Sequence, residues 1–198
     1  MIKFFSAFLL ILVTSSCQNR SKETSDIPTG SAGAAVKLKS LVSPVDSVSA
    51  EPYLFTDKNG LVYLSWIEKV KEKSSLKFVI LNNNKWSEPS VISLGDNWFV
   101  NWADYPQIAT DGGQILVAHF LEKSDKGTYT YDIKLVTSLD GGKTWGASRI
   151  LHDDGKKAEH GFVSITPYGT NYFISWLDGR NAAMEGGEGQ HRGHHGQM

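Results

Sequence analysis

The chain of 198 residues lacks the features of several protein classes. It has one cysteine, Cys17, so no internal disulfide can form. Its 20 basic side chains nearly balance 21 acidic ones, which gives no electrostatic reason to expect a nucleic-acid partner. The apolar run at residues 4–13 is about ten residues long, whereas a membrane-spanning helix needs roughly 20. No segment shows the apolar period of an amphipathic helix.

The N-terminus has the features of an export signal. Residues 1–16 contain the apolar run 4–13, followed by small polar residues and then Cys17. This stretch resembles a bacterial lipoprotein signal peptide, although Thr14 stands where the family usually has leucine. The resemblance implies cleavage before Cys17, lipidation of its thiol, and, from Gln18, an outer-membrane or cell-surface location. The alternative is an ordinary secretory signal in which Cys17 is incidental.

A flexible tether is predicted to follow. Residues 17–49 are rich in Ser, Thr, Gly and Ala and poor in large apolar side chains. Such a segment cannot bury enough surface to offset the conformational entropy that ordering would cost. The tether would connect the lipid, which binds the membrane, to a domain at residues 50–198.

The predicted domain is all-β and built from repeats. Short runs with alternating or β-branched character are separated by turn residues, as at 52–57, 61–69, 76–82 and 89–95. Trp66, Phe120 and Trp176 recur at a spacing of about 54 residues, the length of a four-stranded propeller blade. We therefore expect a β-propeller with blades at about 50–95, 104–152 and 159–198, the last one incomplete.

One turn carries a recognisable motif, Ser-Leu-Asp-Gly-Gly-Lys-Thr-Trp at residues 138–145. We expect Asp140 to accept hydrogen bonds from turn amides and Gly141 and Gly142 to adopt positive φ. The motif resembles the Asp-box of the sialidase superfamily and its BNR-repeat relatives. Its positions here are Ser138, Asp140, Gly142, Thr144 and Trp145. The resemblance implies a structural hairpin on the face opposite the ligand site, and six blades when complete.

The opposite end of the blades is the expected ligand face. Glu51, Asp104 and Glu159 each precede a predicted first strand, which would bring three carboxylates to the mouth of the channel. They can attract a cation, or they can be solvated surface residues. Asp104 is also the candidate acid or base of a catalytic site.

The loop at residues 95–106 includes a group of three aromatic side chains close together in the sequence, Trp98, Phe99 and Trp102. Aromatic rings stack on the C–H faces of sugars, so Trp98 and Trp102 are candidate ligand-binding residues. The alternative is that at least two of the three rings fill the seam between two blades.

Two further clusters are candidates for binding. Arg180 can grip a ligand carboxylate together with Asp178, or the two can form a structural ion pair. His191, His194 and His195 lie in a Gly-rich segment that can loosely capture a divalent metal such as zinc or copper, or be a mobile loop. No cofactor is required by any of these readings.

The sialidase resemblance supports the fold better than the activity. That family uses a tyrosine and glutamate pair, an aspartate acid, and three arginines that hold the substrate carboxylate. After the tether only Arg149, Arg180 and Arg192 remain, and Arg149 and Arg192 fall away from the expected face. The chain holds about two and a half blades, whereas six need on the order of 320 residues.

Two explanations fit the short length. The chain is either a truncated product, which we favour because it stops inside a loop, or it closes its ring with other chains. Three functions remain. The first is a lipid-anchored propeller that binds glycans or other surface ligands without catalysis. The second is a sialidase-like glycoside hydrolase whose remaining residues lie in missing blades. The third is an assembly scaffold.

Overall fold

The structure is a computed structural model that describes residues 38–182. The leader, Cys17, most of the tether and the three C-terminal histidines lie outside these residues. The chain divides into the units Met1–Ser40 and Leu41–Met198, and all described strands belong to the second. No helix within residues 38–182 is long and apolar enough to span a bilayer.

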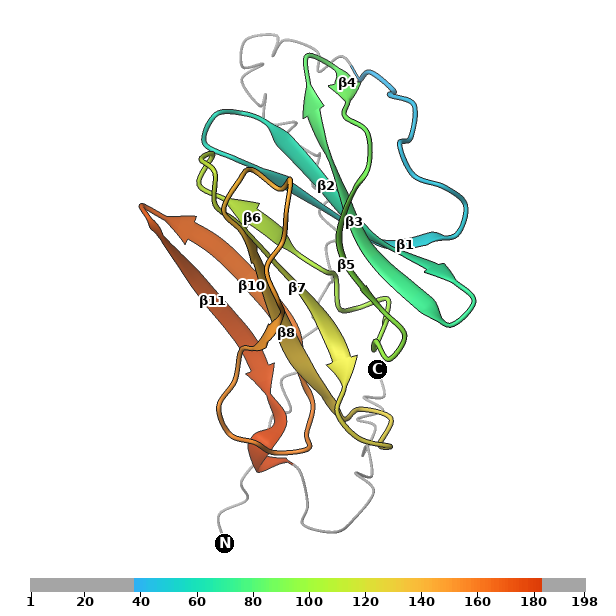
Figure 1. The fold of residues 1–198 in the computed structure, drawn as a ribbon, viewed down its shortest axis with the longest axis vertical. Coiled ribbons are helices and arrows are strands. Elements are labelled where there is room, and N and C mark those ends of the chain that lie inside the picture. The colour runs from blue at the N-terminus through green and yellow to red at the C-terminus, as the bar shows by residue number, and fades with distance from the viewer. Residues whose placement is uncertain (1–37, 183–198) are drawn as a thin grey trace, which may run out of the picture. The chain divides into compact units, whose positions relative to one another are not determined.

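The described part of the second unit is all-β, as expected, and its strands form three antiparallel sheets (Figure 1). The first sheet contains β1 (Ser49–Thr56), β2 (Val62–Val70), β3 (Lys73–Asn82), β4 (Lys85–Trp86) and β5 (Ser90–Gly95). The second contains β6 (Ile108–Thr110), β7 (Leu116–Lys123), β8 (Tyr131–Ser138) and β9 (Arg149–Ile150). The third pairs β10 (His160–Tyr168) with β11 (Asn171–Asp178), which a short 3-10 turn, η1 (Gly179–Asn181), follows.

The sheets have the strand order of propeller blades. In the first sheet β1, β2 and β3 are neighbours, and both β4 and β5 pair with β3. In the second the order is β6, β7, β8, β9. The turn from β3 to β4 uses Asn83 and Asn84, both at positive φ (49° and 61°), which is the backbone of a tight hairpin. The first blade therefore turns at this point without an Asp-box.

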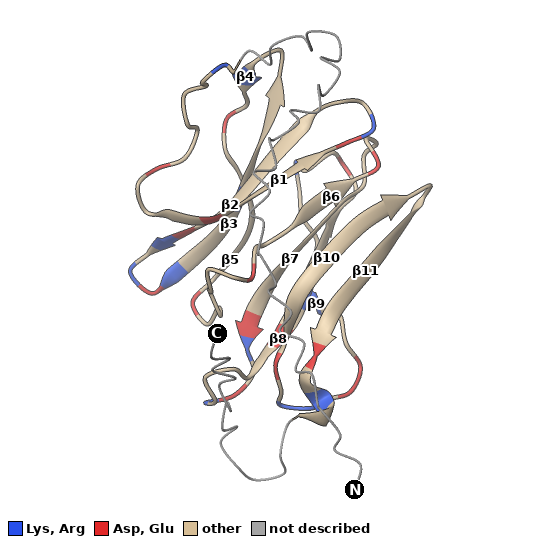
Figure 2. Ribbon diagram, turned by 180° about the vertical axis from the view of Figure 1, so that it is seen from behind, with Lys and Arg blue, Asp and Glu red and all other residues tan. Residues whose placement is uncertain are grey.

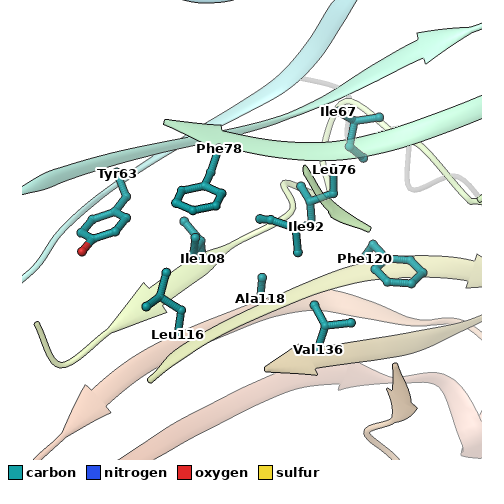
Figure 3. Packing of buried hydrophobic residues seen from close by; sticks show 10 residues of the cluster. All are labelled: Tyr63, Ile67, Leu76, Phe78, Ile92, Ile108, Leu116, Ala118, Phe120 and Val136. Carbon is teal, nitrogen blue, oxygen red and sulfur yellow. The ribbon is translucent and has the colours of Figure 1, made fainter. Parts of the chain in front are cut away.

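The middle blade is buried on both faces. Along β7, alternate side chains enter different cores, as the two-residue period of a strand requires. Leu116 and Phe120 face the first blade, while Val117 and Leu121 face the third. Figure 3 shows the first core, where Phe78 and Leu76 approach the side chains of the middle blade. Nearly continuous apolar sequence in β7 is thus explained by contact on both sides.

Polar side chains also join the blades. The hydroxyl of Ser65 on β2 donates to the carbonyl of Pro106 at 2.8 Å. The side-chain amide of Gln107 donates to the carbonyl of Val163 at 2.6 Å and accepts from the amide of Ile165 at 2.9 Å. One glutamine therefore bridges the inner strands of the second and third blades.

The predicted equivalence of Glu51 and Glu159 needs correction. Glu51 lies within β1 rather than before it, at a β-bulge, with φ of 55°. By strand register its counterpart is Phe162, which has φ of 51° in the corresponding bulge of β10. Both strands carry the same bulge, so strand register defines the equivalent positions, and it places the counterpart of Glu51 three residues after Glu159.

Candidate functional site

The Asp-box hairpin has the geometry predicted for it. The hydroxyl of Ser138 donates to Asp140 Oδ1 at 2.8 Å. The backbone amide and hydroxyl of Thr144 donate to the same carboxylate at 2.9 and 2.6 Å. These hydrogen bonds, those from Thr144 first, lower the pKa of Asp140 to about 2. Gly141 and Gly142 both have positive φ, at 75° and 86°.

The same hairpin packs against the neighbouring blade. The ring of Trp145 meets Phe78 of β3 edge to face, with centroids 6.0 Å apart. A Cβ atom added to Gly142 would stand 2.6 Å from Phe78 Cζ. The Asp-box of the second blade is therefore part of the seam with the first.

The other end of the blades gathers most of the candidate ligand residues. The strands β7 and β11 both run toward this end, and the loops into β6 and β10 start there (Figure 1). The Asp-box follows the far end of β8, beside the β6–β7 turn, where the Gly141 amide donates to the carbonyl of Gln114 at 2.8 Å. The Asp-box and Asp104 thus lie at opposite ends of the middle blade, as the sequence predicted.

Of the group Trp98, Phe99 and Trp102, two rings are partly buried and pack against the cores. Trp98 stacks on Phe120 with centroids 4.2 Å apart, and Phe99 stacks on Tyr131 at 4.0 Å. The third ring, Trp102, is 79% exposed. Of the two tryptophans in this loop, Trp102 is the exposed one.

Asp104 lies in a buried polar contact between the second and third blades. Its Oδ1 accepts the backbone amide of Phe162, and the hydroxyl of Tyr131 lies 3.4 Å from its Oδ2. That hydroxyl also donates to Glu159 Oε1 at 2.9 Å. Burial raises the pKa of Asp104, the hydrogen bonds from Phe162 and Tyr131 oppose the rise, and the Glu159 carboxylate adds to it.

The group of Asp104, Tyr131 and Glu159 is closely packed. Tyr131 is fully buried, and burial together with the hydrogen bond to Glu159 raises its pKa far above the usual value. Gly161 leaves the necessary space, because an added Cβ would stand 3.0 Å from both Asp104 Oδ2 and Tyr131 Cε2. A buried phenol that retains its proton is a poor nucleophile, so Tyr131 serves to hold the two carboxyl groups in place.

Asp178 and Arg180 form the ion pair that the sequence left as one alternative. Arg180 donates from Nε and from its terminal nitrogen to Asp178 Oδ2, at 2.8 and 2.6 Å, and from its backbone amide to Oδ1 at 3.1 Å. Hydrogen bonds from Arg180 hold the pKa of Asp178 well below its usual range. Figure 2 shows acidic and basic segments meeting where β11 ends.

A second group at this end was not predicted from the sequence. His152 and His160 stack with ring centroids 3.7 Å apart and contact the carboxylates of Asp132, Asp154 and Asp178. Three ligand atoms, one each from Asp132, His152 and His160, lie within 4.8 Å of one another, as do three from Asp154, His160 and Asp178. The sequence signal was His-Asp-Asp at 152–154 followed by Glu-His at 159–160.

Comparison with known proteins adds evidence on the fold. No protein-family model matches the chain, and no curated protein matches it. Among solved structures, α-L-arabinanase from Penicillium chrysogenum, determined in complex with arabinobiose, superposes with a TM-score of 0.50. The match has 16% identity and covers 65% of this chain. It spans 41% of the arabinanase, which is a β-propeller. The chain is therefore an all-β, propeller-type protein with incomplete blades, and no sialidase or BNR relationship is found.

Proposed function

We propose that this chain is part of a carbohydrate-binding β-propeller whose ligand lies at the Asp104 end of the blades. The observation that carries the proposal is Trp102, an indole that is 79% exposed in the loop leading to Asp104. An exposed tryptophan beside polar groups is the usual platform for a sugar ring. The arabinanase of similar fold was determined with a disaccharide bound, which supports a glycan as the ligand class.

The proposed activity of this chain is binding without turnover. Asp104 is 6% exposed and engaged by Phe162 and Tyr131, so its carboxyl group is held within the seam between blades. Arg180 is occupied by Asp178, and together they would shape the rim of the ligand surface. Trp98 would support the loop through its stack on Phe120.

A glycoside hydrolase is the second candidate, and one observation favours it. Burial raises the pKa of Asp104, as is needed for a carboxyl group that donates a proton to a leaving sugar. In this alternative Asp104 is the acid and further catalytic residues come from additional blades.

Trp102→Ala tests the binding proposal, with Tyr168→Ala as a matched control. Tyr168 is also well exposed, at 71%, but it ends β10 at the opposite end of the blade. We expect Trp102→Ala to weaken binding of arabino-oligosaccharides or sialosides on a glycan panel by about tenfold, and Tyr168→Ala to leave it unchanged. Equal binding by both variants would contradict the proposed surface.

A hydrolysis assay, combined with the binding panel, separates the binding protein from the hydrolase and the scaffold. Hydrolysis of a fluorogenic glycoside that is lost in Asp104→Asn would support the hydrolase. Absence of both binding and turnover would favour a scaffold.

We further propose that the protein is anchored by a lipid on Cys17 and faces the outside of a bacterial outer membrane. The leader at residues 1–16 and Gln18 carry this proposal. Labelling with a radioactive fatty acid should mark the protein and should be lost in Cys17→Ser. Labelling that survives this substitution would refute lipidation at Cys17.

A further inference from the structure

Three equivalent positions at the Asp104 end of the blades carry exposed or partly exposed side chains. The first strands of the blades are β1, β6 and β10, and β6 contacts both of the others. Opposite the residues that precede Trp66, Phe120 and Trp176 stand Tyr53, Gln107 and Ser164, respectively. The residues two places before these three are Glu51, Tyr105 and Phe162. In a propeller the first strands surround the central channel, so we call Glu51, Tyr105 and Phe162 the mouth positions.

Tyr105 shows that the mouth positions do not face a neighbouring blade. It is 43% exposed, although the second blade packs against the first blade on one face and the third on the other. Phe173 behaves differently. It is 64% exposed, whereas its counterpart in the second blade, Val117, is 5% exposed. The exposure of Phe173 therefore comes from an uncovered blade face, and the exposure of the mouth positions comes from their place at the end of the blades.

Phe162 also has a strained backbone conformation. Its φ of 51° is one that bulky side chains rarely adopt. Within residues 38–182, the other non-glycine residues at positive φ are its counterpart Glu51 and three residues of hairpin turns, Lys71, Asn83 and Asn84. Strain of this kind persists where the surrounding structure or a function requires it.

The folded chain alone does not account for the ring of Phe162. The hydrogen bond to Asp104 comes from the backbone amide, so glycine would make the same bond without strain. Burial of the ring offsets the strain only in part, because Phe162 is 48% exposed. An exposed aromatic ring that is kept in a strained conformation points to contact with a ligand.

The neighbouring residues suit a sugar chain. Trp102 is two residues from Asp104, a span of at most about 7 Å, and the amide of Phe162 contacts the Asp104 carboxylate. The exposed rings of Trp102 and Phe162 therefore flank Asp104, one from the second blade and one from the third. Each ring has a face on which one sugar unit can stack.

We propose that Phe162 is a second aromatic contact for the ligand, which is a glycan of at least two sugar units, with one unit on Trp102 and the next on Phe162. This inference rests on the proposed carbohydrate-binding function. The other mouth positions, Tyr105 and Glu51, supply a phenol and a carboxylate that can hydrogen-bond sugar hydroxyls.

The test compares short and longer sugars by calorimetric titration of the full chain. The probes are arabinose with arabinobiose and arabinotriose, and N-acetylneuraminic acid with sialyllactose. In the parent protein, at least one longer sugar should bind about tenfold more tightly than its monosaccharide. Phe162→Gly should remove this advantage and leave monosaccharide binding unchanged, whereas Trp102→Ala should weaken binding of both.

Stability measurements separate a ligand contact from a structural role. Phe162→Gly relieves the strain, so its melting temperature should equal that of the parent or exceed it by a few degrees. Lys71→Gly is the matched control, because Lys71 is exposed in a hairpin turn at a similar φ of 55°. It should leave sugar affinity unchanged. Phe162→Tyr keeps an aromatic ring and should retain the affinity for the longer sugars.

The outcomes distinguish this inference from the function on which it rests. If Trp102→Ala loses affinity but folded Phe162→Gly keeps the advantage of the longer sugar, the inference is wrong and the binding function stands. Phe162→Asn repeats the test if Phe162→Gly does not fold, because asparagine also tolerates positive φ. If the parent binds none of the sugars, both the function and the inference fail.

Discussion

Gly142 offers a sharp test of how the Asp-box hairpin contributes to stability. Its φ of 86° is in the left-handed region, where an alanine costs about 1 kcal/mol relative to glycine. An added Cβ would also stand 2.6 Å from Phe78 Cζ and 3.2 Å from Leu116 Cδ2. Both of these side chains are buried in the core between the first and second blades, so neither can move away freely.

The expected loss follows from these two effects. Overpacking of a core typically costs about 1–3 kcal/mol, so Gly142→Ala should lower the free energy of unfolding by about 2–4 kcal/mol. For a domain of this size the melting temperature should fall by roughly 4–16 °C. Differential scanning calorimetry and denaturant titration would measure the change.

Gly155→Ala provides the matched control. Gly155 also has positive φ, 62°, but no atom lies within 4 Å of the added Cβ. This variant should show the backbone cost alone, about 1 kcal/mol. If the two variants lose equal stability, the close packing of the hairpin against Phe78 contributes nothing and the reasoning fails.

Two more predictions concern stability. Asp140→Ala removes the acceptor of three hydrogen bonds and should lower the melting temperature by a few degrees without changing glycan affinity. The control Asp153→Ala should change neither the melting temperature nor the glycan affinity. Lost affinity of Asp140→Ala at an unchanged melting temperature would oppose a structural role. Burial lowers the pKa of His119 to about 3 from its ordinary 6.5. Below pH 6.5 the unfolded chain therefore binds a proton that the folded protein does not, and stability should fall by about 1.4 kcal/mol per pH unit toward pH 3. Denaturant titrations between pH 6.5 and 4 should show that the free energy of unfolding falls less steeply with pH in His119→Gln than in the parent protein. An identical pH dependence in both proteins would refute this assignment.

Local sequence patterns predicted the strands and the Asp-box hairpin because both depend on neighbouring residues. The two-residue period of β1 and the glycines after Asp140 act over a few positions only. The partial burial of Trp98 was not predictable in this way, since its stacking partner Phe120 lies on β7, more than 20 residues further along the chain. An exposed and a partly buried tryptophan in one loop look alike in sequence.

The histidine cluster depends on contacts that local patterns do not contain. His152 and His160 meet because the chain between β9 and β10 doubles back, and Asp132 reaches them from β8. Strand register likewise places Glu51 within β1, where its counterpart in the third blade is Phe162 and not the Glu159 that the repeat suggested. Insertions within a strand and the path of irregular segments are set by tertiary packing, which a repeat alignment does not capture.

The glutamine that bridges the second and third blades has a consequence for motion. Ile165 gives its amide hydrogen to the side chain of Gln107, and the same side chain holds the carbonyl of Val163. Both bonds must open together when the inner strands separate. Exchange of the Ile165 amide hydrogen with deuterated solvent therefore reports the frequency of that separation, at a single site and without a label.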